Sequence, residues 1–207
     1  MLLHATGKYL PNRWVFHFRE ALAELVGREG AEGVLRAIPN PIDDLTGSGQ
    51  DLEKSFDFSR YAAMCASVSD VYGEEGAQTI LRRAGHAAFT RMLKSTAAMA
   101  GVERPGIPAQ PASESFEAQM QSIVRLWGLL SDLECACERT EGEYRFRIFA
   151  CPECAGRTAA GCLCHSMAGM LQAALDWFGS STALTASEIQ CMSQGASQCE
   201  FSLAGKT

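Results

Sequence analysis

Apolar positions recur with the helical period through most of the first 130 residues. The stripe over 14–37 is interrupted near Gly27, and the stripe over 58–99 is interrupted at Gly73. A glycine inside such a stripe ends one helix before the next begins. A third stripe lies within 116–130, so the pattern predicts helices in all three segments. The apolar members of the third stripe are Phe116, Met120, Ile123, Val124 and Trp127.

From Leu133 onward the pattern changes to the two-residue alternation of strands. LECACER and EYRFRIFAC alternate apolar and polar side chains, and TALTASEIQCM and SQCEFSLA form a second pair around a Ser-Gln-Gly turn. Between the two pairs, 159–179 has helical spacing and ends at Gly179. N-terminal helices followed by a ββαββ unit indicate an α+β fold with an antiparallel sheet.

Two stretches rich in proline, glycine and polar residues punctuate the chain at 38–55 and 100–115. Proline among glycine and polar residues ends helices, so both stretches are expected to be linkers. The expected organisation is an N-terminal helical segment over 1–57 and a small-molecule-binding unit over 58–207. The two are expected to pack as one compact body.

A weak internal repeat relates 25–37 to 71–83. The two segments share glycine, glutamate, alanine, leucine and arginine positions at a constant offset. Two copies are too few for a solenoid, which needs at least three repeats to bury a continuous core. The repeat is either a duplicated helical hairpin or chance.

Composition and charge narrow the classes of protein. The chain has 207 residues, a formal net charge of −6 and scattered basic side chains. Nucleic-acid binding selects clustered Lys and Arg, so no nucleic-acid partner is expected. No segment approaches the ~18 consecutive apolar residues of a membrane span, and the N-terminus lacks the features of a secretory signal. The expected protein is cytoplasmic and has no membrane span.

Nine cysteines are many for a reducing compartment, where metal ligation and burial are more common than disulfides. Only Cys65 lies in the first 130 residues, and it is expected to be an isolated core thiol. Cys191 and Cys199 flank the closing turn, so they face each other when the two strands pair. Glu188 joins them only if a bulge or bend interrupts the strand, because residues three apart face opposite sides of a regular strand.

Further donors precede this hairpin. Cys162 and Cys164 lie near the start of the preceding helix, and together with the hairpin residues they match the ligands of a structural, tetrahedral zinc site. Cys151 and Cys154 form a Cys-x-x-Cys motif, CPEC, which is typical of a zinc knuckle or a redox pair. The antiparallel context disfavours the redox interpretation. The two sets can share a cysteine, and plain burial of the thiols is the remaining alternative.

The spacing of these residues resembles the signature of the four-vinyl-reductase domain family. The resemblance rests on Cys164-(four residues)-Gly169 and on Glu188-x-x-Cys191-(seven residues)-Cys199-x-Phe201. The segment YGEEGAQTILRRAGHAAF is also similar to the family's earlier helices, so the likeness covers about 58–203. The family comprises small-molecule-binding domains of bacteriochlorophyll biosynthesis proteins, archaeal proteins and phenol-responsive transcription activators.

The resemblance implies a structural zinc ion as the cofactor. In the phenol sensors the equivalent Cys, Glu, Cys and Cys bind zinc, which here implies the ligands Cys164, Glu188, Cys191 and Cys199. One departure from the sensors is the CPEC motif, for which they have no obvious counterpart. The alternate ligands are therefore Cys151, Cys154 and Cys162.

The chain is most similar to the stand-alone family members of bacteriochlorophyll biosynthesis, since ATPase and helix-turn-helix modules are absent from the sequence. Those members are named for reduction of the 4-vinyl (8-vinyl) group of divinyl protochlorophyllide. Vinyl reduction needs a hydride donor, and the sequence contains no nicotinamide or flavin motif. The resemblance therefore implies a tetrapyrrole-binding carrier or accessory factor with no catalytic residues. The alternatives are the 4-vinyl reductase itself and a protein-interaction module without a small ligand.

A tetrapyrrole carrier needs an apolar slot and an axial ligand for magnesium. His86 and Phe89 share a predicted helical face with Leu93, which makes the first two the candidate ligand-binding residues. The alternative is a half-buried histidine beside ordinary core residues. Besides a Mg-tetrapyrrole or other apolar small molecule, the expected partners are other enzymes of bacteriochlorophyll biosynthesis and a second copy of the chain in a homodimer.

Overall fold

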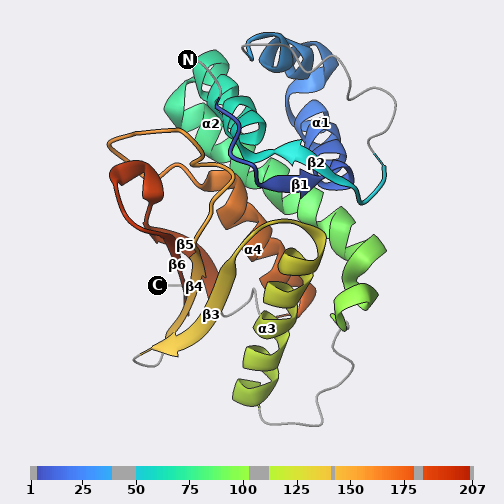
Figure 1. The fold of residues 1–207 in the computed structure, drawn as a ribbon, viewed down its shortest axis with the longest axis vertical. Helices are drawn as coiled ribbons and strands as arrows, with labels where there is room; N and C mark the ends of the chain where they lie inside the picture. Colours follow the sequence, from blue (N-terminus) through green and yellow to red (C-terminus); the bar gives the residue numbers. More distant parts are fainter. Residues whose placement is uncertain (1–3, 39–49, 103–111, 141–142, 180–183, 206–207) are drawn as a thin grey trace.

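The computed structural model describes residues 4–38, 50–102, 112–140, 143–179 and 184–205 (Figure 1). Helices occupy the first part of this chain, and a ββαββ unit follows, so the predicted α+β class is confirmed. The predicted linkers fall largely outside the described residues. The helices and strands, in chain order, are β1 (Tyr9–Pro11), α1 (Asn12–Arg36), β2 (Lys54–Asp57), α2 (Phe58–Thr96), a 3-10 turn (Ala97–Ala100), α3 (Ala112–Leu130), β3 (Cys135–Thr140), β4 (Glu143–Ile148), α4 (His165–Trp177), β5 (Leu184–Gln190), a second 3-10 turn (Met192–Gln194) and β6 (Cys199–Gly205).

Both long helices bend at a glycine that the sequence marks. Gly27 within α1 has φ 78° and ψ 161°, and Gly73 within α2 has φ 71° and ψ 166°. Glycine adopts a positive φ at little cost, so each residue interrupts the helical backbone where the apolar stripe predicts a break. The kinks occupy equivalent positions of the weak repeat. The repeat therefore corresponds to a helix–glycine–helix shape that occurs twice.

Two further glycines allow α2 and α4 to cross at close range. A Cβ atom at Gly85 would lie 2.1 Å from the Ser166 carbonyl oxygen, and one at Gly169 would lie 2.0 Å from the Arg82 carbonyl oxygen. Neither distance leaves room for a side chain, so the two backbones pack directly against each other. On another side α4 packs against β5 (Figure 1). The position of α4 thus depends on its packing against both α2 and β5.

The four strands of the C-terminal sheet are ordered β3-β4-β6-β5, and each neighbouring pair is antiparallel. The two predicted hairpins therefore lie side by side through β4 and β6. The register of β5 against β6 shifts between Glu188 and Gln190. This irregularity meets the condition that the strand pattern sets for Glu188 and Cys191 to face the same site.

An aromatic cluster forms the centre of the core, where the helices meet the sheet. The ring of Trp14 lies 5.9 Å from that of Phe89 and 5.8 Å from that of Trp127. Trp127 also lies 5.6 Å from Phe89 and 5.2 Å from Phe146. All four side chains are fully buried. Such pairs contribute about 0.5–1.5 kcal/mol each beyond their burial, so this cluster joins α1, α2, α3 and the sheet.

Two features differ from the sequence prediction. β1 and β2 pair with each other in an antiparallel two-stranded sheet. They have three and four residues, which is too short for a recognisable alternation. The helix expected over 159–179 begins only at His165. The preceding segment is instead held in an irregular path by cysteine contacts to distant parts of the chain.

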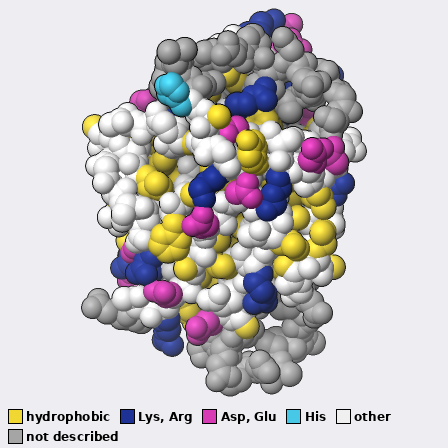
Figure 2. Space-filling view, in the orientation of Figure 1, with side chains coloured by type: hydrophobic (Ala, Val, Ile, Leu, Met, Phe, Trp, Pro, Cys, Tyr) yellow, Lys and Arg dark blue, Asp and Glu magenta, His cyan; other side chains and the backbone are white. Residues whose placement is uncertain are grey.

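The surface agrees with the scattered charge of the sequence. Figure 2 shows basic and acidic side chains interspersed with hydrophobic ones on the face it presents. Among the described residues, no helix combines the length and the apolar character that crossing a membrane requires.

Candidate metal centre

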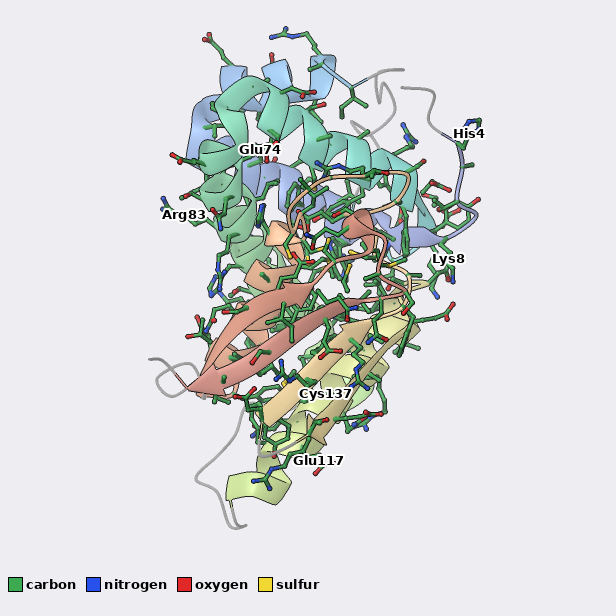
Figure 3. The ribbon with its side chains drawn as sticks, turned by 90° about the vertical axis from the view of Figure 1, so that its left-hand side faces the viewer. His4, Lys8, Glu74, Arg83, Glu117 and Cys137 are labelled. Atoms are coloured by element: carbon green, nitrogen blue, oxygen red, sulfur yellow. The ribbon has the colours of Figure 1, made fainter. Side chains whose placement is uncertain are left out.

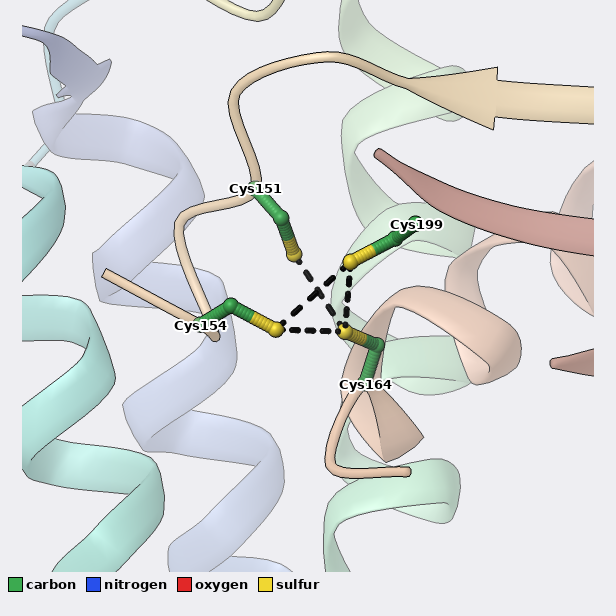
Figure 4. A group of neighbouring side chains, drawn as sticks. All are labelled: Cys151, Cys154, Cys164 and Cys199. Atoms are coloured by element: carbon green, nitrogen blue, oxygen red, sulfur yellow. Dashed lines mark hydrogen bonds between the residues drawn. The ribbon is translucent and has the colours of Figure 1, made fainter. Parts of the chain in front are cut away.

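Five cysteine sulfurs converge beside the start of α4. Cys151 and Cys154 lie in the loop after β4, Cys164 immediately precedes α4, Cys191 follows β5, and Cys199 begins β6. Each of the five is at most 6% exposed. Figure 4 shows four of these side chains pointing toward one another. The fold thus gathers thiols from separate segments into one buried site.

The sulfur–sulfur distances are short. The Cys154 Sγ lies 3.1 Å from the Sγ of Cys164, 3.3 Å from that of Cys191 and 3.6 Å from that of Cys199. The Cys164 Sγ lies 3.4 Å from the sulfurs of Cys151 and Cys199, and 3.7 Å from that of Cys191. Four sulfurs at ~2.3 Å from one tetrahedral zinc ion would be ~3.8 Å apart. The cluster therefore has about the size of a metal–thiolate site.

Within the part of the chain that the structure describes, two overlapping groups of donors could each hold a metal ion, since the donor atoms within each group lie within 4.8 Å of one another. One is the set that the family resemblance implies, and the other contains both cysteines of CPEC. Four buried protein ligands are typical of a structural site, because a catalytic site keeps a position for water or substrate. The groups are Cys164, Glu188, Cys191 and Cys199, and Cys151, Cys154, Cys164 and Cys199.

Glu188 lies at the bulge of β5 and belongs to the first of these groups. Its Oε2 accepts a hydrogen bond from the backbone N–H of Cys164 at 2.9 Å. Its Oε1 is buried and has no hydrogen-bond partner among the described residues. Burial raises the pKa of this carboxyl to about 8. An unsatisfied buried oxygen beside the thiols marks a place where a cation or a proton is stabilised.

Burial and mutual hydrogen bonds set the protonation of the thiols. Burial raises the pKa of Cys151 to about 11 and raises that of Cys164 well above its usual range. Cys191 differs, because hydrogen bonds from Cys154, Cys164 and Cys199 lower its pKa. Only thiolates coordinate metal ions, so metal binding to this cluster releases protons.

Other cysteines that the sequence singles out lie apart from the cluster. The spacing offers Cys162 as an alternate ligand, but it is half-buried, and its Sγ contacts the Gln194 Oε1 at 3.5 Å. Cys162 belongs to neither group of converging donors. Cys65 is fully buried on α2 and likewise belongs to neither group, as expected for an isolated core thiol.

The glutamate inside CPEC has a role that spacing does not reveal. Glu153 is fully buried. Its carboxylate accepts hydrogen bonds from the backbone N–H groups of Ser166 and Met167 and from the Ser166 hydroxyl, at 2.7–3.2 Å. These N–H groups belong to the first turn of α4, so Glu153 caps that helix from 13 residues earlier in the chain. Burial raises the pKa of Glu153 to about 7.

The two candidate ligand-binding residues lie in different surroundings. Phe89 is fully buried in the aromatic cluster. His86 is half-exposed, and its Nε2 lies 2.7 Å from Asp176 Oδ2. His86 also borders a groove of about 590 Å³ between α1, α2 and α4. Of this pair the structure places only His86 at the groove, and contact of either residue with a ligand stays a prediction.

Residues 144–204 match the family model of the four-vinyl-reductase domain. The matched span contains every donor of both groups in the cluster. This match supports the family resemblance that the cysteine and glutamate spacing indicates. No curated protein matches the chain.

Solved structures show the same overall fold. An H-NOX protein from S. oneidensis in the Fe(II)NO ligation state has 12% identity and a TM-score of 0.62, and 96% of this chain and 100% of that chain are covered. An Fe(II) unliganded H-NOX protein from K. algicida has 10% identity and a TM-score of 0.60, with 96% and 97% covered. Subunit 3 of a trafficking protein particle complex from Naegleria fowleri, covalently bound to palmitic acid, has 15% identity and a TM-score of 0.55, with 72% and 93% covered. The chain therefore carries a four-vinyl-reductase domain pattern over 144–204 within a fold that it shares with H-NOX proteins.

Proposed function

We propose that this protein binds a tetrapyrrole of the divinyl protochlorophyllide type and acts as its carrier or accessory factor in bacteriochlorophyll biosynthesis. A structural zinc ion in the cysteine cluster is part of the proposal. The observation that carries it is the groove beside His86, which combines apolar walls with two arginines, one glutamate and an imidazole. The match to the four-vinyl-reductase domain supports a small-molecule role. The H-NOX protein from S. oneidensis, which shares the fold, was solved in an Fe(II)NO ligation state, and this supports binding of a metal-containing ligand by the same fold.

The groove suits an apolar ligand that carries a carboxylate. Its volume of about 590 Å³ lies within the ~300–1,000 Å³ of small-molecule sites. Ala21, Leu25 and Ala87 supply apolar wall, and two arginines supply positive charge. The lining also contains Glu24, whose carboxylate is paired with Arg91 at 2.6 Å. Arg82 donates to the Ala186 carbonyl oxygen at 2.7 Å, which fixes its guanidinium against β5. Arg83 is exposed and projects outward from α2 (Figure 3), where it is available to a ligand carboxylate.

His86 supplies the group that would coordinate the magnesium of such a ligand. Its Nε2 is hydrogen-bonded to the Asp176 carboxylate at 2.7 Å. Histidines that bind metals commonly use one ring nitrogen for the metal and the other for a carboxylate, which orients the ring and raises its basicity. The Asp176 contact therefore prepares Nδ1 of His86 as the ligand atom.

Zinc is the metal proposed for the cysteine cluster, because thiolates, with or without one carboxylate, suit a tetrahedral zinc ion without redox chemistry. The site would act on the groove through α4. Cys164 immediately precedes this helix, and Gly169 and Gln172 of the same helix border the groove. Zinc would thus fix one wall of the ligand site.

A carrier role accounts for the groups at the groove. Binding an apolar macrocycle needs a concave surface and a few polar anchors, whereas reduction also needs a positioned hydride donor. The groove supplies positive charge and one imidazole, and the thiols are buried in a closed set. The alternatives are the 4-vinyl reductase itself and an interaction module without a small ligand.

The test is a titration of the purified chain with protochlorophyllide, followed by visible absorption, with zinc and iron measured on the same sample. We expect saturable binding and stoichiometric zinc. Arg83→Gln should weaken binding about fivefold, the effect of losing one exposed ion pair of about 1 kcal/mol. Lys94→Gln is the matched control, because Lys94 is an exposed cation of α2 that does not border the groove. His86→Ala should alter the absorption spectrum of the bound ligand.

Three outcomes would contradict parts of this proposal. No binding at micromolar concentration would reject the tetrapyrrole role and leave the interaction module. Steady vinyl reduction by the isolated protein with NADPH would establish the reductase. Iron together with iron–sulfur absorbance would reject zinc.

A further inference from the structure

The cysteine cluster offers more donors than one zinc ion uses. Five sulfurs and the Glu188 carboxylate converge, whereas tetrahedral zinc takes four ligands. The set that the family resemblance implies contains Glu188, but the sensors from which it is taken have no obvious counterpart of CPEC. The contacts inside the cluster distinguish between the candidates for the fourth ligand.

We infer that Cys154 is the fourth zinc ligand, beside Cys164, Cys191 and Cys199, and that Glu188 is a positioning residue. This inference rests on the zinc centre of the proposed function and does not depend on the ligand of the groove. It departs from the ligand set that the resemblance implies at one position, where a thiolate takes the place of a carboxylate.

The Cys154 sulfur is the donor that completes a tetrahedron. It lies 3.1, 3.3 and 3.6 Å from the sulfurs of Cys164, Cys191 and Cys199. The Cys164 sulfur lies 3.7 Å from that of Cys191 and 3.4 Å from that of Cys199. The sixth edge, between the sulfurs of Cys191 and Cys199, is within 4.8 Å. These edges approach the ~3.8 Å of a zinc tetrathiolate, so a small expansion around one ion would give the ideal site.

Cys151 does not compete for this position. Whereas the Cys191 sulfur lies within hydrogen-bond range of two of the other proposed ligands, Cys154 and Cys164, that of Cys151 lies within this range of Cys164 alone among them. The Cys151 sulfur lies 3.4 Å from that of Cys164, within range of an S–H···S hydrogen bond. With zinc on Cys164, Cys151 would be left as a thiol in position to donate to the Cys164 thiolate, which is a common kind of support for a metal–sulfur bond.

Glu188 is engaged with the backbone of a ligand through one carboxylate oxygen, while its other oxygen, Oε1, is buried beside the thiols without a hydrogen-bond partner among the described residues. Its Oε2 accepts the Cys164 N–H at 2.9 Å, which fixes the residue that immediately precedes α4. The bulge in β5 brings the carboxylate to this position. A carboxylate that holds a ligand residue in place by a hydrogen bond acts on the metal from the outside and tunes its affinity.

This ligand set would make the CPEC loop part of the metal centre. The set with Glu188 links only the start of α4 to the last hairpin, whereas Cys154 also links the loop that follows β4. Glu153 precedes Cys154 and caps the first turn of α4. Zinc bound through Cys154 would therefore fix the helix cap as well as the cysteines.

The experiment is zinc K-edge X-ray absorption on the full chain, together with absorption spectra of the Co(II)-substituted protein. We expect four sulfur neighbours and no oxygen neighbour. In the cobalt form, Cys154→Ser should lose about a quarter of the sulfur-to-metal charge-transfer intensity, because one of four thiolates is removed. Glu188→Gln should keep the four-sulfur spectrum and weaken metal binding about 10- to 100-fold, the usual effect of removing an outer hydrogen bond.

Cys151→Ser is the matched control and should keep stoichiometric metal and the four-sulfur spectrum. Three sulfurs and one oxygen in the unmodified protein would overturn the inference, as would a spectrum that changes in Glu188→Gln but not in Cys154→Ser. If Cys154→Ser fails to fold, the unmodified protein and Glu188→Gln decide the question. Failure to bind any tetrapyrrole would not affect this test, because X-ray absorption and the cobalt spectrum report only the atoms that coordinate the metal.

Discussion

The helical region of α1 and α2 and the C-terminal region from Cys151 onward are stabilised by different means. The first is held by buried aromatic and aliphatic side chains, and its bends are made by Gly27 and Gly73. The second gathers five thiols and two carboxylates from segments far apart in the chain. Apolar packing tolerates many side chains of similar size, whereas a metal-type cluster needs particular atoms at particular points. Substitutions should therefore affect the two regions to different extents.

Helix capping shows the same contrast at smaller scale. Asp57 caps α2 and accepts the backbone N–H of Ser59, its close neighbour, at 2.8 Å. Glu153 caps α4 from 13 residues away and is fully buried. The contact of Asp57 with Ser59 is local and partly accessible to sequence reasoning, although the same carboxylate also accepts hydrogen bonds from Thr6 and Gly7. The Glu153 cap exists only because the CPEC loop folds back onto α4.

Disruption of the cysteine cluster should have the largest effect. Structural zinc contributes about 10 kcal/mol or more to the folding of small zinc peptides, so Cys199→Ser should release the metal and destabilise the last hairpin by several kcal/mol. Hydrogen exchange should then rise over β5 and β6 while α1 and α2 stay protected. Cys65→Ser should retain the metal, because Cys65 lies outside the cluster. Stoichiometric zinc and unchanged protection in Cys199→Ser would contradict the proposed site.

The helix crossing should be the next most sensitive point. Gly169→Ala would place a Cβ atom 2.0 Å from the Arg82 carbonyl oxygen, so α2 and α4 would have to separate. We expect a loss of about 3 kcal/mol in the free energy of unfolding, the upper part of the range for overpacking. Gly128→Ala is the control, because this exposed helical position has no atom within 4 Å of an added Cβ. It should stabilise the chain by about 0.5–1 kcal/mol, and equal effects at both positions in urea denaturation would show that the crossing is not tight.

Removal of the remote cap should cost somewhat less. Glu153→Ala would leave the buried N–H groups of Ser166 and Met167 without their acceptor. An unsatisfied buried donor costs about 1–3 kcal/mol, so we expect a loss of about 2 kcal/mol in thermal or urea unfolding. Asp70→Ala, at an exposed position of α2, should change stability by less than about 0.5 kcal/mol. Similar stabilities for these two variants would mean that the cap contributes nothing.

The local cap should give the smallest effect, with a pH dependence. Asp57→Ala should cost about 1–2 kcal/mol, the usual value of an N-cap, because Thr6 and Gly7, which also donate to this carboxylate, are exposed and can donate to water instead. Burial by itself raises the pKa of Asp57, but hydrogen bonds from Ser59 and Thr6 outweigh it and hold the pKa below its ordinary value. A lowered folded-state pKa gives stability that is present above about pH 3.9 and is lost as the pH falls through the folded-state value. The difference between the two proteins should therefore shrink below about pH 4, and a constant difference down to pH 2 would rule out this ionic contribution.

Several features of the fold follow from short stretches of sequence. The breaks at Gly27 and Gly73 were predictable because glycine is the residue that adopts a positive φ at little cost. The change to strands after Leu133 follows from the two-residue alternation. The sequence showed only that Glu188 and Cys191 need a bulge in order to share a site, and the structure has a register shift there. The start of α4 was predicted too early, because the contacts that hold the preceding cysteines come from β5 and β6 and not from neighbouring residues.

The sequence by itself determined the helix and strand periods, the glycine breaks and the set of sulfur donors from which a metal site could be made, because these depend on residues a few positions apart. Only the tertiary structure decided that Cys154 enters the cluster and Cys162 does not, that Glu153 caps α4, and that Gly85 and Gly169 face the opposite backbone. It also separated His86, at the groove, from Phe89, in the core. These outcomes depend on how distant segments pack, and residues with the same local spacing can end on opposite sides of a packed interface.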